Sequence, residues 1–390
     1  MNKLPGFGLI ERARALAPLI ASEADEIERT RRLTPKVVSA LIENGLYRSL
    51  LPQSTGGSEA PLEVFMRMLE EVARADASTA WCLGQCSVCA MTAAYLDPAT
   101  AKEIFGPPTG ILAWGAIKGE VQVVPGGYRA HGRWDFASGS RQASWLGAHV
   151  QVVDADGKRR LKPSGAPEIR TILFPLASAT MYDVWDVIGL RGTGTDSYSV
   201  DNLFVPERFS ALRDDATAVL EKGPIYQLPT HIVFAMGFAS VAVGVARATL
   251  DAAMDLSRSK IPQGLKVMHE NSAVQATLGR TEGNLRAARA YLHATAGEVW
   301  RDLVDTGKYT EQHRIALRLA STWTLHQATA VVDTAYHMAG ATAVFAANKF
   351  ERRFRDMHAI AQQIQARDTH YEDVGRALLA AKPNAGDDVT

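Results

Sequence analysis

The sequence predicts a mostly helical α+β protein in which a β-rich segment lies between two helical ones. Apolar residues recur at helical spacing before residue 110, and long helical patterns return after residue 218. Between them, short β-branched and aromatic runs alternate with Gly, Pro, Asp and Asn. We therefore expect three domains, namely an N-terminal helical domain at 1–110, an antiparallel β-barrel or sandwich at 111–217 and a C-terminal four-helix bundle at 218–390.

The first domain shows its helices by pattern and by capping residues. ERARALAPLIASEADEIERTRRL, which begins at Glu11, has apolar positions on one side and charge on the other. A second helix begins at Thr34-Pro35, a cap followed by proline in the first turn, and ends near Gly45. The three cysteines Cys82, Cys86 and Cys89 share one helical face and lack a fourth ligand at metal-site spacing, which favours buried core thiols.

The middle domain contains an unusual strand segment, HGRWDFASGSRQASWLGAHV, at residues 131–150. Its centre is Ser138-Gly139-Ser140, small and polar, with Trp134 on one side and Trp145 on the other. An ordinary strand does not need small, polar residues at its centre, whereas a strand that lies beside a flat aromatic ligand could use them. The structural alternative is a β-bulge or turn at Ser138-Gly139.

The last domain is expected to bury its first helix and to support subunit packing. FAMGFASVAVGVARATLDAAM has too little polar surface for a lone surface helix. Three further helical patterns follow it and complete the bundle. The sequence contains no G-x-G-x-x-G joining a strand to a helix, so we do not expect NAD(P)H to bind here.

Composition excludes several classes of function. Lys+Arg and Asp+Glu are each 42, which gives no net charge with which to attract nucleic acid or an anionic membrane. The N-terminus is broken by charge and proline, so no signal peptide is expected. No apolar run approaches the roughly 18 residues of a membrane span. We expect a cytoplasmic protein.

Four stretches carry a resemblance to a known family. They are LPQSTGG, GGYRAHGRWDFASG, WDVIGLRGTGTDSYSVDNLFVPE and MAGATAVFAANKFERRFRDMHA, spread from about residue 30 to the C-terminus. Together with the order of the domains they resemble the acyl-CoA dehydrogenase superfamily and imply its fold. The pattern G-x-W-x-F-x-S-G is similar to that of the two-component (group D) flavin-dependent monooxygenases.

This resemblance implies an activity, a cofactor and partners. The chain would be the oxygenase component, taking FMNH2 or FADH2 from a separate NAD(P)H:flavin reductase. With O2 it would form a peroxide on the flavin and hydroxylate an aromatic or heteroaromatic molecule in aromatic compound catabolism. Relatives pack as homotetramers. Two alternatives stay open, namely an acyl-CoA dehydrogenase-like FAD oxidoreductase and a non-catalytic member of the fold.

The resemblance also implies which residues meet the flavin. Ser138 would accept the proton of the reactive flavin nitrogen in a dry pocket, which delays loss of hydrogen peroxide. Arg280 would meet the flavin phosphate, although a surface arginine fits the pattern equally well. The cofactor-binding residues expected in this way are Trp114, Gly115, Trp134, Ser138, Thr193, Arg280 and Gly340.

The chain departs from the family near its C-terminus. Dehydrogenases carry a catalytic Glu shortly after an Arg-Asp pair and many of the monooxygenases a His, whereas here Arg355-Asp356 is followed by Gln363. On a regular helix His358 would point about 140° away from Gln363, which leaves His370 as the candidate base. Gln363 cannot ionise a phenol but can hydrogen-bond a ring N–H or a carboxylate. We therefore expect an indolic or other heteroaromatic substrate.

Overall fold

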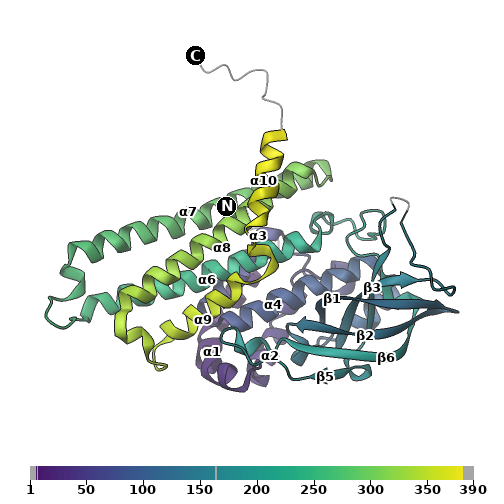
Figure 1. Ribbon diagram of the computed structural model, residues 1–390, viewed down its shortest axis with the longest axis horizontal. Helices are drawn as coiled ribbons and strands as arrows, with labels where there is room; N and C mark the ends of the chain where they lie inside the picture. Colours follow the sequence, from purple (N-terminus) through teal and green to yellow (C-terminus); the bar gives the residue numbers. More distant parts are fainter. Residues whose placement is uncertain (1–5, 7, 163–164, 381–390) are drawn as a thin grey trace, which may run out of the picture.

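The computed structural model describes residue 6 and residues 8–162 and 165–380. The N-terminal helices lie against the longer C-terminal helices, and the strands form a separate layer to one side of them (Figure 1). This is the expected order of an N-terminal helical domain, a middle β-domain and a C-terminal helical bundle, so the expected architecture is confirmed.

The N-terminal domain is built around two buried helices that follow each other directly. The major helices here are α1 (Gly8–Thr30), α2 (Pro35–Glu43), α3 (Leu62–Ala75), α4 (Ala77–Ala90) and α5 (Pro98–Phe105). Asp76 caps α4 by accepting the backbone N–H of Thr79 at 2.7 Å. Every α4 side chain except Gln85 is buried, and its three cysteines are free thiols. The prediction of core cysteines is therefore confirmed.

The middle domain is one seven-stranded sheet in the order β5-β6-β2-β1-β3-β4-β7. The strands are β1 (Leu112–Val124), β2 (Gly127–Ala137), β3 (Trp145–Val153), β4 (Ile169–Pro175), β5 (Thr180–Tyr182), β6 (Asp196–Pro206) and β7 (Ser210–Ala211). All neighbours pair antiparallel except β1 and β3, which run parallel. The purely antiparallel expectation was wrong here. After β2 the segment containing η4 (Ser140–Gln142) carries the chain across to the free side of β1.

The C-terminal domain is a bundle around one apolar helix. Its helices are α6 (Thr230–Ser259), α7 (Ser272–Thr306), α8 (Glu311–Ala339), α9 (Lys349–Ala361) and α10 (Thr369–Ala380). By length and composition α6 could cross a membrane, but 89% of its most apolar window is buried inside the protein. It packs against α3, α4 and α8 and is a core helix. Helix α10 projects from the body of the molecule (Figure 1).

Candidate active site

A β-bulge near the end of β2 turns Ser138 toward the helical domain. The pairing of β2 with β6 shifts register between Trp134 and Ala137, and Phe136 within the shift has a left-handed φ of 63°. Gly139 follows with φ 80° and lies against α4. The turn that the sequence left as an alternative at Ser138-Gly139 is thus present, directly after a bulge. It also delivers the Ser138 hydroxyl to a buried position facing Trp81 of α4.

Gly139 is required by its contact with α4 as well as by its backbone conformation. A Cβ at this position would lie 2.6 Å from the sulfur of Cys86. We expect Gly139→Ala to lower the free energy of unfolding by about 2 kcal/mol, as a left-handed alanine adds strain to the clash. Urea unfolding measures the loss. In a Cys86→Ala background the steric part should be relieved, and an unchanged loss there would contradict this account.

Ser138 belongs to a row of three buried hydroxyls. Its Oγ accepts the indole N–H of Trp81 at 3.1 Å and lies 2.7 Å from Oγ1 of Thr195. Thr195 in turn lies 2.7 Å from Oγ1 of Thr193. The exposed fractions of Ser138, Thr195 and Thr193 are 6%, 3% and 1%. Thr193, predicted to contact flavin directly, is here committed to protein partners, and Thr195 was missed.

A row of aromatic rings connects Ser138 with Trp114. Trp81 stacks on Phe238 of α6 with ring centroids 3.7 Å apart and planes 6° apart. Phe238 stacks on Phe234 at 5.6 Å, and Phe234 meets Trp114 edge-on at 6.2 Å. We call these four rings the aromatic row. It joins α4, α6 and β1, so two of the predicted site residues, Ser138 and Trp114, stand at its two ends.

Trp134 and Gly115 are built into the sheet interior. The ring of Trp134 is fully buried over Gly119 and Gly132, and its Nε1 donates to the carbonyl of His149 at 3.1 Å. A Cβ on Gly115 would lie 2.5 Å from the carbonyl oxygen of Asp135, so the glycine serves strand packing. The complete burial of Trp134 argues against the predicted flavin contact.

Phe136 is the aromatic side chain of β2 that reaches the surface. It is 60% exposed, and its ring meets Trp185 edge-on at 6.4 Å. In an unbroken strand Trp134 and Phe136 would share one face. The bulge places one inside and the other outside, which alternation in the sequence could not reveal. A strained, exposed aromatic residue two positions before Ser138 is typical of a binding site.

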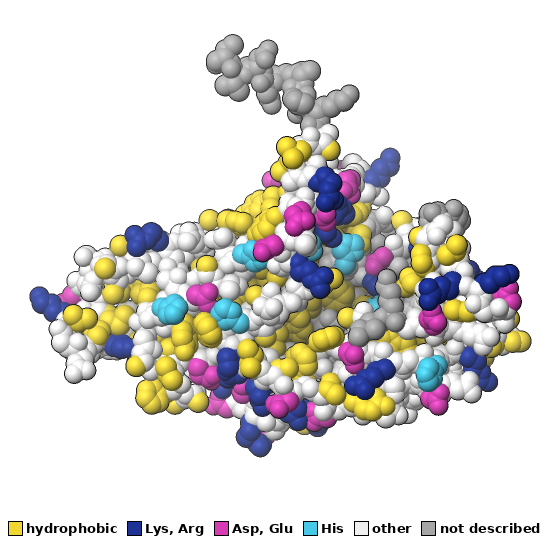
Figure 2. Space-filling model, viewed as in Figure 1, with side chains coloured by type: hydrophobic (Ala, Val, Ile, Leu, Met, Phe, Trp, Pro, Cys, Tyr) yellow, Lys and Arg dark blue, Asp and Glu magenta, His cyan; other side chains and the backbone are white. Residues whose placement is uncertain are grey.

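A cavity of about 450 Å³ lies beyond Trp114. It is lined by residues of β3, of β4, of the segment between them and of the segment after β7, namely His149, Lys162, Ala166, Pro167, Ile169, Thr171, Arg213 and Asp214. The Arg213 guanidinium lies 5.1 Å from the Trp114 ring centroid. On the visible face, Figure 2 shows a hollow with hydrophobic side chains beneath α10 and beside the strands. The aromatic row is thus flanked by accessible space.

Gln363 leaves a buried amide without a partner. Helix α9 ends at Ala361, so the regular helix assumed between His358 and Gln363 is wrong. His358 instead pairs with Asp333 at 2.9 Å. Both the oxygen and the nitrogen of the Gln363 amide are buried and make no hydrogen bond within the described part of the chain. Because buried polar groups normally have partners, this amide is suited to a ligand.

The remaining predicted site residues have other surroundings. Nδ1 of His370 lies 3.0 Å from the Thr322 hydroxyl and 3.1 Å from the Gln365 carbonyl oxygen, and burial lowers the pKa of its imidazole. Arg280 is exposed on α7, which packs chiefly on α8. Gly340, at the end of α8, has φ 54° and lies near the Lys260 ammonium. The structure does not bring Arg280 or Gly340 to Ser138 within one chain.

The residues at Ser138 fit a flavin. A buried hydroxyl with acceptor capacity and an exposed ring two residues earlier are groups that a planar, hydrogen-bonding ring system would meet. Among the described residues no group of three His, Cys, Asp or Glu could hold a metal ion.

Comparison with known proteins agrees with this architecture. Residues 10–105 match the family "Acyl-CoA dehydrogenase, N-terminal domain", and residues 236–367 match "Acyl-CoA dehydrogenase, C-terminal domain". A pigment production hydroxylase of Rhodococcus sp. is 31% identical over 75% of this chain and 74% of its own. Indole-3-acetate monooxygenase of Pseudomonas putida is 26% identical over 93% and 91%. XiaF from Streptomyces, solved with FADH2, matches with TM-score 0.87 and 22% identity over 97% and 96%.

The chain therefore belongs to the acyl-CoA dehydrogenase superfamily. Within that superfamily it is a flavin-dependent monooxygenase. The resemblance inferred from the sequence is confirmed.

Proposed function

We propose that the chain is the oxygenase component that receives reduced flavin from a separate NAD(P)H:flavin reductase and hydroxylates an aromatic or heteroaromatic small molecule. The observation that carries this proposal is the buried Ser138 hydroxyl at one end of the aromatic row. Names of several relatives as oxygenase subunits or components support the separate reductase. The alternative of a dehydrogenase is disfavoured because Gln363 cannot act as its catalytic base.

In this proposal the flavin ring lies beside Ser138, with Phe136 and Trp114 along it. Reduced flavin supplies the electrons that activate O2. Ser138 would accept a hydrogen bond from the N–H of the flavin ring and so keep that proton on the ring. Trp81 and Phe238, stacked and nearly buried, keep bulk water away from that bond.

We infer that the substrate is indolic or another electron-rich heteroarene. The buried Gln363 amide offers an oxygen to a ring N–H and a nitrogen to a carboxylate. Burial lowers the pKa of the His370 imidazole and so weakens it as a base, and its Nδ1 already contacts the Thr322 hydroxyl and the Gln365 carbonyl oxygen. The indole-3-acetate monooxygenase relative acts on a molecule with both recognised groups.

Turnover of matched indole and phenol compounds, with an added flavin reductase, tests the substrate class. We expect a higher kcat/KM for the indole, and a drop of about tenfold for that compound alone in Gln363→Leu, because one hydrogen bond to the substrate is lost. Product is measured by chromatography. A clear preference for the phenol would overturn the heteroarene assignment.

We propose a cytoplasmic location, because the reductase that supplies the reduced flavin depends on NAD(P)H. We also propose that the protein assembles as a homotetramer. Helix α10 supports association, since it projects from the body and exposes Leu378 and Leu379 by 66% and 90%. Sedimentation measures the assembly.

A further inference from the structure

The row of three hydroxyls ends at a backbone carbonyl that accepts several hydrogen bonds. The Leu190 oxygen receives the Trp185 indole N–H at 2.9 Å, the Thr193 backbone N–H at 3.1 Å and the Thr193 hydroxyl at 2.8 Å. A carbonyl can only accept, so the single hydroxyl proton of Thr193 is committed to Leu190. Thr193 therefore has only acceptor capacity left.

The direction of each later bond follows from this commitment. Thr193 lies 2.7 Å from Thr195, and since Thr193 has no proton to give, Thr195 donates. Thr195 lies 2.7 Å from Ser138, and since the proton of Thr195 is already used, Ser138 donates. All three hydroxyls are almost fully buried, so bulk water does not offer competing partners.

Trp81 fixes the other side of Ser138. Its indole nitrogen only donates, and it gives its proton to Ser138 Oγ at 3.1 Å. The indole is held by stacking on Phe238. A hydroxyl has one proton and two lone pairs. Ser138 donates its proton to Thr195 and accepts the Trp81 N–H with one lone pair. One lone pair is left for a ligand.

We propose that Thr195 is a positioning residue that makes Ser138 an acceptor only, and so sets the site's preference for the reduced flavin. This inference rests on the proposed placement of the flavin beside Ser138. The reactive nitrogen of reduced flavin carries an N–H, whereas in oxidised flavin the same nitrogen can only accept. An acceptor-only Ser138 can bond the first form and leaves the second unsatisfied.

The anchor of the row is itself held by the C-terminal helices. Leu190 has a left-handed φ of 52°, and its N–H donates to Oδ1 of Asp356 on α9 at 2.7 Å. That bond holds the backbone of the residue whose carbonyl group anchors the row. The polarity of Ser138 is therefore set by a loop clamped between β6 and α9.

Anaerobic binding of reduced and oxidised flavin to the apo-protein tests the inference. In the wild type we expect reduced flavin to bind more tightly than oxidised flavin. Thr195→Val should lower this ratio of affinities about three- to tenfold, because the oxidised form should bind more tightly. The freed Ser138 proton can then point to the ligand. Thr195→Ser should keep the wild-type ratio, and Thr193→Val, which frees the Thr195 proton, should change it in the same direction as Thr195→Val.

If Thr195→Val and Thr193→Val lowered the affinities for reduced and oxidised flavin equally, the inference would be overturned. Such a result would mean that the two threonines act on flavin binding only through packing. Ser138→Ala separates this failure from failure of the proposed site. A ratio that responds to Ser138→Ala but not to the threonine variants leaves the flavin site standing and removes the role of Thr195. A ratio unmoved by Ser138→Ala overturns the flavin placement as well.

Discussion

Ser138→Ala is expected to raise the ratio of hydrogen peroxide to hydroxylated product by about tenfold or more. The variant removes the acceptor that holds the flavin proton, and it leaves the Trp81 N–H without its partner. Reduced flavin should still be consumed, but its electrons should appear as hydrogen peroxide. Peroxide and product are measured together under turnover with an added reductase.

Ser87→Ala is the matched control. Ser87 lies on α4, like Trp81, and its buried hydroxyl has no partner within the described residues. Its substitution also removes a buried serine hydroxyl, and no hydrogen bond links Ser87 to the row of hydroxyls within the described residues. If both variants gave the same peroxide ratio, the effect would belong to packing, and the role assigned to Ser138 would be wrong.

The sequence was sufficient for features that local patterns determine. Helical periodicity and the change to short β-rich runs indicated the order of the elements. The Ser138-Gly139 anomaly and the lone Gln363 each pointed to a residue that the structure leaves with unused hydrogen-bonding capacity.

Features that depend on tertiary contacts could not be predicted. The parallel pairing of β1 with β3 depends on a crossover connection. Which of the two side chains Trp134 and Phe136 is buried and which is exposed depends on one bulge. Thr195 carries no motif of its own. Its role follows only from two 2.7 Å contacts and from which of their partners has a proton left to donate.

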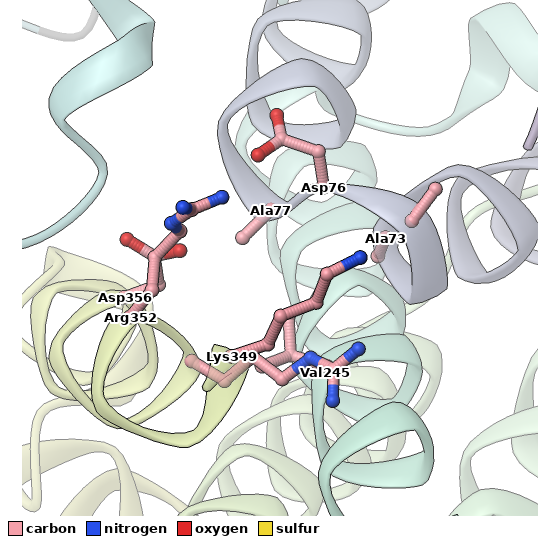
Figure 3. Close-up of a pocket in the computed structure, with 9 residues that line it drawn as sticks. Ala73, Asp76, Ala77, Val245, Lys349, Arg352 and Asp356 are labelled. Carbon is pink, nitrogen blue, oxygen red and sulfur yellow. The ribbon is translucent and has the colours of Figure 1, made fainter. Parts of the chain in front are cut away.

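Asp356 is a buried carboxyl group at the foot of the anchoring loop. It is 2% exposed and lines a cavity of about 20 Å³, enough for about one water molecule. Figure 3 shows Asp76, at the start of α4, across this cavity from Asp356, Arg352 and Lys349. Three neighbouring arginines have other partners. Arg352 pairs with Asp25, Arg353 donates to the Ala248 carbonyl oxygen, and Arg355 pairs with Glu351 and Glu28.

These surroundings favour the neutral form of the carboxyl group. Burial, aided by the charges of Asp76 and Glu28, raises the pKa of Asp356 to about 8, against the Leu190 N–H and Arg355, which lower it. The ordinary pKa is 3.8, so between these values the folded protein binds a proton that the unfolded chain has released. The bound proton makes its full contribution to the free energy of unfolding below the unfolded-state pKa of 3.8, and this contribution is lost as pH rises toward 8.

We therefore expect the wild-type protein to lose stability relative to Asp356→Asn between pH 5 and pH 8, by about 1 kcal/mol per pH unit. Asparagine cannot ionise, yet its oxygen can still accept the Leu190 N–H. Urea unfolding of the apo-protein at intervals of one pH unit measures the difference. Asp255→Asn, which alters an exposed carboxylate on α6, should run parallel to the wild type. If the stability of Asp356→Asn followed that of the wild type at every pH, Asp356 would have the same pKa in the folded and the unfolded protein. A neutral buried carboxyl group at this position would then be excluded.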